Sequence, residues 1–149
     1  IERKYMSPRY PGHNNIEKYK VIIAESDGAA GQIGKPIPAQ ICGIPCVGNP
    51  YDSASSTFMS IGAFDSEEQA VNCSTYIKTK FLRCLLGILK VTQHTPPSVW
   101  AYIPLQDFTS SSDINWSATI EDIDMQLYQK YNLSDKEIAF IEKTIKPMK

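Results

Sequence analysis

Hydrophobic and polar residues alternate over residues 55–64 and then recur at helical spacing as far as Lys90. The first stretch is rich in β-branched and aromatic side chains, and it predicts a strand that stops at Asp65. Ser66 and Glu68 follow, where a small capping side chain and a glutamate reaching back can open a helix. The long apolar stripe predicts one helix that breaks or bends near Gly87. This stripe comprises Ala70, Cys73, Ile77, Phe81, Cys84, Leu85 and Ile88.

Three further short runs predict strands. Residues 19–24 (Tyr-Lys-Val-Ile-Ile-Ala) are rich in β-branched residues and lead into turn-forming residues, which is typical of a central strand. Residues 41–47 predict a weaker strand, because Pro45 cannot donate to a ladder and favours a sheet edge or a bend. Residues 98–103 predict a final short strand, which Pro104 ends.

The last third of the chain changes to a helical pattern. Ser117 is placed to cap a helix, and Asn132 is a plausible left-handed stop for it. Ser134 and Glu137 form a second capping-box pattern, and Pro147 would end the helix that they open. Apolar residues recur on one side of each helix, and these residues are Ile120, Ile123, Leu127, Tyr131, Ile138, Ile141 and Ile145. We therefore expect a helical hairpin.

Together these elements predict an α/β (α+β) fold, with a mixed β-sheet, one long packed helix and a C-terminal helical hairpin. The 149 residues are enough for one hydrophobic core. We expect an entry segment or linker at 1–18, a main domain at 19–106 and the hairpin at 107–149. Because the chain starts at Ile1 rather than Met, it is interpreted as a fragment of a larger protein. The sequence has no membrane-span or signal-peptide pattern, which favours a soluble, cytoplasmic protein.

The cysteines and glycines argue against metal and nucleotide sites. Four cysteines and two histidines lack zinc-finger spacing, so we expect no metal, and Cys73 and Cys84 fit as buried free thiols. Gly28, Gly31 and Gly34 do not match either phosphate-binding loop pattern. Asn49-Pro50-Tyr51 lacks the second proline of the adenine methyltransferase signature, so we interpret it as a turn.

The charge distribution leaves two interpretations of the long helix open. The chain carries a net charge of −1, yet its four charged residues between Gln69 and Gln106 are all basic. They would form either a local positive field or an ordinary solvated helix face.

Several stretches together resemble one known family. Residues 19–24, residues 57–64 leading into Ile77-Lys-Thr-Lys-Phe-Leu-Arg-Cys-Leu-Leu, and Trp100-Ala-Tyr-Ile-Pro-Leu-Gln-Asp-Phe are similar to the C-terminal part of bacterial type II restriction-modification adenine methyltransferases. Asp113-Ile-Asn-Trp-Ser and Glu137-Ile-Ala-Phe-Ile-Glu resemble the segment that closes many of those enzymes. The likeness extends over about residues 19–148.

This resemblance implies a TaqI-like target recognition domain, which reads a short double-stranded DNA sequence while a separate catalytic domain of the same chain methylates adenine. The parent would use S-adenosylmethionine and be an adenine-N6 methyltransferase or a fused restriction enzyme. The fragment itself would hold no cofactor and no catalytic residues. Base and phosphate contacts need polar and basic side chains on loops and along a rigid element. The candidates are Gln32, Lys35, Gln40, Asn49, Tyr51, Ser55, Lys78, Lys80, Arg83, Lys90, Gln93 and His94.

Two alternatives remain beside DNA recognition. The acidic helical hairpin, with Trp116 and Tyr128 available, would serve a protein-interaction module that docks a partner domain or a second copy. Independently of docking, Arg83 lies within the helix and could equally pair with a C-terminal acid instead of a phosphate. A stand-alone enzyme ranks last, because two histidines without a supporting motif do not assemble a nucleophile, a base and an orienting group.

Overall fold

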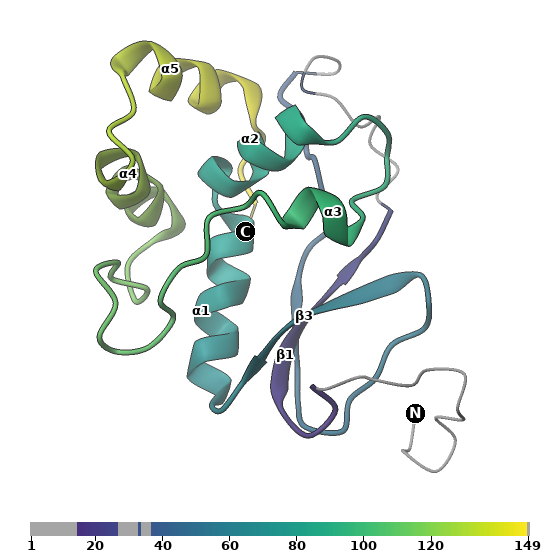
Figure 1. Ribbon diagram of the computed structural model, residues 1–149. Helices are drawn as coiled ribbons and strands as arrows, with labels where there is room; N and C mark the ends of the chain where they lie inside the picture. Colours follow the sequence, from purple (N-terminus) through teal and green to yellow (C-terminus); the bar gives the residue numbers. More distant parts are fainter. Residues whose placement is uncertain (1–14, 27–32, 34–36, 149) are drawn as a thin grey trace.

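The computed structural model describes residues 15–26, 33 and 37–148, and within them the chain forms a three-stranded sheet and five helices (Figure 1). The strand order is β2–β1–β3. Helix α1 lies between the sheet and α4, and α2 packs against α4 and α5. This arrangement confirms the predicted α+β class with helices at the C-terminal end.

The central strand β1 (Tyr19–Ala24) pairs antiparallel with both of its neighbours, β2 (Cys46–Gly48) and β3 (Phe58–Phe64). Val21 is fully buried on the side of β1 that meets the core. The sheet is thus antiparallel throughout the described strands rather than mixed. Because β1 has hydrogen-bonded neighbours on both sides, the prediction of a central strand at residues 19–24 is confirmed.

The predicted long helix is divided in two by Thr79. Helix α1 (Glu67–Lys78) begins at Ser66, whose side chain accepts from the Gln69 amide, and α2 (Lys80–Leu89) begins at Thr79. Thr79 is extended, with φ −62° and ψ 148°, and its hydroxyl accepts from the Leu82 amide. The apolar stripe continues across this break, which is why periodicity alone predicted one helix.

Gly87 does not break or bend the helix where the sequence analysis placed an interruption. It lies inside α2, and a Cβ there would come within 2.6 Å of Ile33 and 2.8 Å of Ile41. Gly87 therefore permits a close approach between the helix and the chain segment that covers it.

The predicted strand at 98–103 is wrong. Its first residues belong to the short helix α3 (Pro97–Trp100), and hydrogen-bonded turns follow through Ile103. Pro97 stands at the first helical position, where proline is favoured because no amide donor is needed. The predicted strand at 41–47 survives only as the short β2, and Ile41, at its predicted start, adopts a positive φ of 78° that no strand residue has.

The C-terminal helices are α4 (Ile120–Lys130) and α5 (Asp135–Thr144). Thr119, not Ser117, caps α4, whereas Asn132 has the expected left-handed φ of 51°. The predicted capping box at Ser134 and Glu137 is confirmed. Both helices pack against α2, so their apolar sides complete the same interior.

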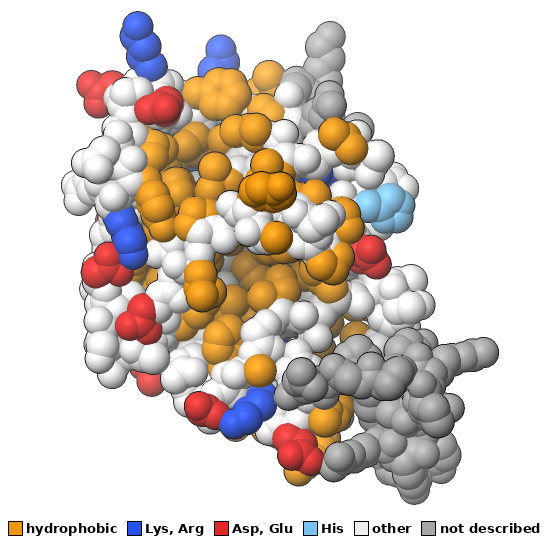
Figure 2. Space-filling view, viewed as in Figure 1, with side chains coloured by type: hydrophobic (Ala, Val, Ile, Leu, Met, Phe, Trp, Pro, Cys, Tyr) orange, Lys and Arg blue, Asp and Glu red, His pale blue; other side chains and the backbone are white. Residues whose placement is uncertain are grey.

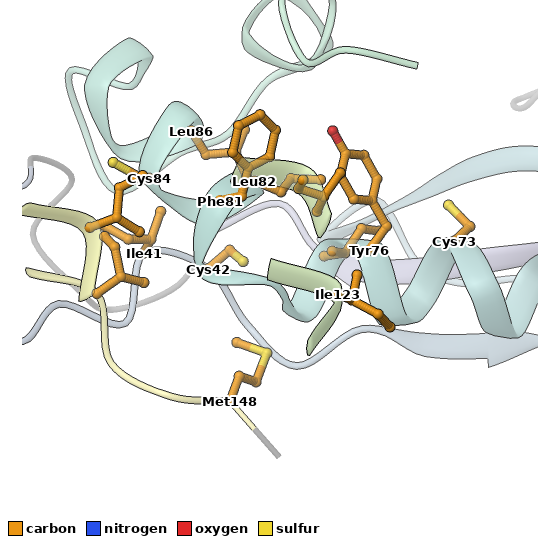
Figure 3. Close-up of a cluster of buried hydrophobic side chains, with 14 of the residues drawn as sticks. Ile41, Cys42, Cys73, Tyr76, Phe81, Leu82, Cys84, Leu86, Ile123 and Met148 are labelled. Carbon is orange, nitrogen blue, oxygen red and sulfur yellow. The ribbon is translucent and has the colours of Figure 1, made fainter. Parts of the chain in front are cut away.

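One continuous hydrophobic cluster joins the sheet, the central helices and the C-terminal helices. Figure 3 shows side chains from α1, α2, α4 and the segment at Ile41 converging, with Met148 near the end of the described chain. The predicted burial of Cys73 and Cys84 is confirmed, and both are free thiols. Burial raises the pKa of Cys73 to about 12 and that of Cys84 to about 11, so both thiols stay protonated and unreactive near neutral pH.

Candidate nucleic-acid interface

The loop between β2 and β3 crosses the face of the sheet that points away from the helices. Val21 and Ile23 of β1 pack into the core, so the alternating Lys20 and Ile22 face the opposite side. Residues 52–54 cover that opposite face, where they line a small cavity of about 40 Å³ together with Lys20, Ile22 and parts of β3. Polar residues on this loop are therefore presented on the side of the sheet that no helix of the described residues covers, which we call the helix-free face.

A turn at residues 49–52 begins this loop. The Asn49 amide donates to the Asp52 carboxylate over 2.7 Å, and the Asp52 amide donates back to the Asn49 carbonyl over 3.0 Å. Tyr51 is held at a φ of 71°, which is costly for a residue with a bulky side chain, and its side chain is 57% exposed. The turn thus holds an aromatic ring in solvent at the expense of backbone strain.

Lys20 anchors this turn from beneath. Its ammonium donates to the carbonyls of Asn49, over 3.0 Å, and Asp52, over 3.1 Å, and it also reaches the Ile16 carbonyl. Burial lowers the pKa of Lys20, while the Asp52 carboxylate opposes that change. Because one cation bridges both ends of the turn, the positions of Asn49 and Tyr51 are fixed relative to the sheet.

Three segments meet at the other end of β1. The Glu25 amide donates to the Thr57 carbonyl over 3.0 Å, and the Thr95 amide donates to the Glu25 carbonyl over 2.9 Å. An isolated β-bridge also joins Ser26 to His94. These bonds bring together three exposed candidates, which are Ser55, Gln93 and His94.

The basic candidates on the helices do not join this surface. Arg83 is 0% exposed and donates to the carbonyls of Lys78, Thr79, Gln40 and Lys146. Lys90 is also buried and donates to the Ile41 carbonyl. The assignment of Arg83 and Lys90 to DNA contacts is therefore wrong for the folded chain, because backbone carbonyls in the interior already bind both cations.

The other three candidates of the helical region and its neighbours have intermediate exposure. Lys80 forms an ion pair with Glu142 of α5, which is the pairing with a C-terminal acid that had been considered for Arg83. Lys78 is half-buried at the end of α1, and Gln40 is half-buried with its carbonyl bound by Arg83. The predicted positive field along the helix thus reduces to Lys78. Two candidates, Gln32 and Lys35, lie outside the described residues.

The two aromatic residues proposed for docking are buried. The Trp116 indole donates to the Asp107 carbonyl over 2.9 Å, and the Tyr128 hydroxyl donates to the Glu142 carboxylate over 2.9 Å. Both rings contact the central helices, Trp116 through Tyr76 and Tyr128 through Phe81. The hairpin is thus attached to its own domain by the residues that had been assigned to a partner.

Sequence reasoning missed Lys20 and Asp124. Lys20 was read only as part of a strand, although a lysine inside an apolar run signals a buried cation that needs acceptors. Asp124 of α4 is buried and accepts from the amides of Lys80, over 2.9 Å, and Phe81, over 2.8 Å. No local pattern links residue 124 to the start of α2.

The chain has no match among family models, curated proteins or solved structures. Within the described ranges, no group of His, Cys, Asp and Glu side chains is arranged to hold a metal ion. None of the helices that the structure describes is long and apolar enough to cross a membrane. Inference about function therefore rests on the site itself and on the family resemblance of the sequence.

Proposed function

We propose that this chain is the DNA target recognition domain of a restriction-modification adenine-N6 methyltransferase. The observation that carries the proposal is the loop 49–57, which lies on the helix-free face of the sheet and is anchored at both ends. Lys20 holds its first turn, and the bonds among Glu25, Thr57 and Thr95 hold its last residues. Base reading needs polar groups on loops that a rigid scaffold positions, and this arrangement supplies them.

The side chains near the two ends of β1 suit contact with base edges. An asparagine amide can bind adenine through two hydrogen bonds, and glutamine can do the same, so Asn49 and Gln93 are candidates for reading A·T pairs. Ser55 and His94 add a hydroxyl and an imidazole at the other end of β1 from Asn49. The Tyr51 ring can pack against sugar or an exposed base, since its strained backbone keeps it in solvent.

The distance between the two ends of β1 limits the length of DNA sequence that these residues can contact. The candidate residues gather at the two ends of β1, whose six residues span about 20 Å. Nucleotides of one B-DNA strand rise by about 3.4 Å each, so the length of β1 corresponds to about six base pairs. A short recognition sequence is the expected consequence.

Cofactor binding and methyl transfer would belong to other parts of the parent protein. S-adenosylmethionine and the methyl-transfer residues would belong to a catalytic domain of the same chain, in a cytoplasmic bacterial enzyme that methylates DNA or also cleaves it. Few free cations line the described part of this face, because Lys18 pairs with Asp65 and Lys20 is bound by the carbonyls of the turn. The catalytic domain is therefore expected to supply most phosphate contacts.

Fluorescence anisotropy with pooled random duplexes, followed by sequencing of the bound fraction, tests this proposal. We expect one short motif to be enriched and the logarithm of the binding constant to fall with the logarithm of salt with a slope of only about −2, since few phosphates are neutralised. The double variant Asn49→Ala, His94→Ala should lose the enrichment. Failure of the chain to bind any duplex in low salt would contradict the proposal.

Charge reversal of Lys78, Lys80 and Arg83 together is not an informative test of DNA binding. Reversing the buried Arg83 would unfold the chain, so loss of binding would carry no information about DNA. Lys143→Glu on α5 is a better control, because it changes an exposed charge away from loop 49–57. It should leave the enriched motif unchanged.

A protein-docking function has one observation in its favour, an exposed apolar surface over the helices (Figure 2). This surface lies on helices and not on loop 49–57, so one domain can use both faces.

A further inference from the structure

A polar cavity lies between α1, α4 and the loop that leads into α4. Its volume is about 450 Å³. Glu68 and Asn72 of α1 and Gln126 of α4 line it, and the loop 109–117 supplies the rest of the wall. Figure 1 shows this loop and α4 beside α1. No residue of loop 49–57 contributes, so the cavity is separate from the surface proposed for DNA.

Asn72 is a buried polar residue that faces this cavity. It is 9% exposed, and its Nδ2 donates to the Phe108 carbonyl over 2.9 Å. Because a carbonyl can only accept, this bond identifies the amide nitrogen and leaves Oδ1 on the other side. Within the described residues, Oδ1 has no donor, and it is not among the fully enclosed unpartnered atoms. Asn72 therefore presents a free acceptor to the cavity.

The charged side chains of the wall are both acidic. They are Glu68 and Asp113. Lys130 lies outside the wall and binds Asp113 over 2.8 Å, whereas Glu68 forms no ion pair within the described residues. Two carboxylates and one ammonium leave a charge of −1. Glu67, the other acid of the first turn of α1, helps to offset the positive end of the helix dipole. The cavity therefore favours a cation over an anion.

Several N–H donors of the wall are already bound within the chain. The Trp116 indole donates to the Asp107 carbonyl over 2.9 Å and to the Ser112 hydroxyl over 3.0 Å. The Gln126 amide donates to the Asp122 carbonyl over 3.3 Å. A ligand that fits this wall therefore has to bring donors of its own.

We propose that the cavity binds a guanidinium group, supplied by an arginine side chain of a partner protein. Glu68 and Asn72 are four positions apart on one flank of α1, so their acceptor oxygens face the same space. A planar guanidinium carries five N–H donors and can bind both oxygens at once. Its methylene stem would pack on Ile114 and the Trp116 ring, which also line the cavity.

The negative charge of the cavity also indicates the source of the guanidinium. Free arginine would bring its own carboxylate close to Glu68 and Asp113, whereas an arginine within a peptide chain has none. The proposal does not rest on DNA recognition, because a phosphate backbone is repelled by the same two acids. Failure of either proposal therefore leaves the other measurable.

Nuclear magnetic resonance of the labelled 149-residue chain tests the proposal. The probe is an acetylated and amidated alanine peptide with one central arginine. The comparison peptide carries citrulline, which has nearly the same shape but a neutral urea group. We expect the side-chain amide signals of Asn72 and the indole signal of Trp116 to shift and saturate with the arginine peptide only. A lysine peptide should bind several times more weakly, since its ammonium cannot span both acceptors in one plane.

Two variants locate the charge that is recognised. Glu68→Gln should weaken the arginine peptide about tenfold, because a charge-assisted hydrogen bond becomes a neutral one. Glu67→Gln is the matched control, since it removes the same charge from the same turn but does not line the cavity. It should change affinity by less than about twofold. Both positions are exposed, so circular dichroism should show a folded chain for each variant.

Four outcomes would overturn the proposal. They are equal binding of the arginine and citrulline peptides, equal binding of the lysine peptide, equal weakening by the two variants, and absence of shifts at Asn72 and Trp116. A fifth is displacement of the arginine peptide by calcium chloride with the same shifts, which would make the cavity a metal-ion site instead.

Discussion

Lys20 and Arg83 are both buried cations that donate to backbone carbonyls, but they occupy different regions. Arg83 lies in the interior, where it joins the break between α1 and α2 to the segment at Gln40 and to Lys146. Lys20 lies on the helix-free face, where its bonds end in an exposed turn. A cation bound by backbone carbonyls thus connects core segments in the interior and positions a loop at the surface.

Although both cations are buried, substitution is expected to have different consequences at the two positions. A cation bound by carbonyls deep in the core can be altered only at the cost of the fold, since each acceptor loses its partner. A cation under a surface turn can be altered with a smaller loss, because water reaches the freed carbonyls. Substitution of Arg83 should therefore mainly lower stability. Substitution of Lys20 should lower stability less and DNA binding more.

The largest effect is expected from Arg83→Met. This change removes the buried cation that donates to the carbonyls of Gln40 and Lys146, and it should lower the free energy of unfolding by about 3–5 kcal/mol. Urea denaturation measures it. Lys143→Met, at an exposed position of α5, is the matched control and should change the same quantity by less than about 0.5 kcal/mol. Equal stability of the two variants would contradict the role given to Arg83.

The second effect concerns Asp124, whose carboxylate accepts from the first amides of α2. Burial raises its pKa from 3.8 to about 6, while the amide bonds from Phe81 and Lys80 and the charge of Arg83 oppose the rise. The folded state therefore binds the proton more tightly than the unfolded state. The resulting stability is fully present below about pH 4 and is lost as pH rises through about 6, a difference of about 3 kcal/mol.

Asp124→Asn removes this titration and is the measurement that checks it. The wild-type chain should lose about 2 kcal/mol more than the variant between pH 4 and pH 7 in urea denaturation, because the carboxyl of the unfolded chain is already largely ionised at pH 4. Asp65, Asp107 and Glu137 titrate at lower pH in both proteins, so their contributions cancel in the difference. Parallel stability curves for the two proteins would show that Asp124 is not the titrating group.

The third effect is expected from Lys20→Met. Loss of the ammonium frees the carbonyls of Asn49 and Asp52 and should lower the free energy of unfolding by about 1–2 kcal/mol, less than for Arg83. Binding of the selected duplex should weaken in the variant that remains folded, because the turn is no longer fixed. Anisotropy below the thermal transition measures that loss. Unchanged affinity would mean that Lys20 does not position the turn for DNA.

The smallest effect on stability is expected from Tyr51→Gly. Glycine adopts a positive φ without strain, and the Tyr51 side chain is largely exposed, so unfolding should change by less than about 0.5 kcal/mol. DNA affinity should nevertheless fall because the ring is lost. Tyr51→Phe is the control for the ring itself and should retain binding. A variant that binds as tightly as wild type with Gly at this position would exclude Tyr51 from the interface.

Elements governed by neighbouring residues were predictable from the sequence. The capping box at Ser134 and the left-handed stop at Asn132 depend on side chains within a few positions, and both occur as expected. The central strand 19–24 was recognised from its composition. Local chemistry decided these elements, so no knowledge of distant partners was needed.

Elements governed by distant residues were not predictable. The break at Thr79 is stabilised by Asp124, whose carboxylate binds the amides of Lys80 and Phe81 from another helix. The same limit applied to the candidate site. Arg83 and Lys90 follow helical positions that read as surface, and only the carbonyls of residues 40, 41 and 146 explain their burial. Tertiary contacts overrode the local pattern at each of these positions.

The pairing of Ala39 with the C-terminal tail has a consequence for biosynthesis. The Ala39 amide donates to the Thr144 carbonyl over 2.7 Å, and the Lys146 amide donates to the Ala39 carbonyl over 2.8 Å. Ile145 and Met148 are buried in the shared core. On the ribosome, this interior therefore stays open until residues 145–148 have left the exit tunnel. We expect this interior to close only after α5 and residues 145–148 are synthesised, with no stable intermediate on the nascent chain before that point.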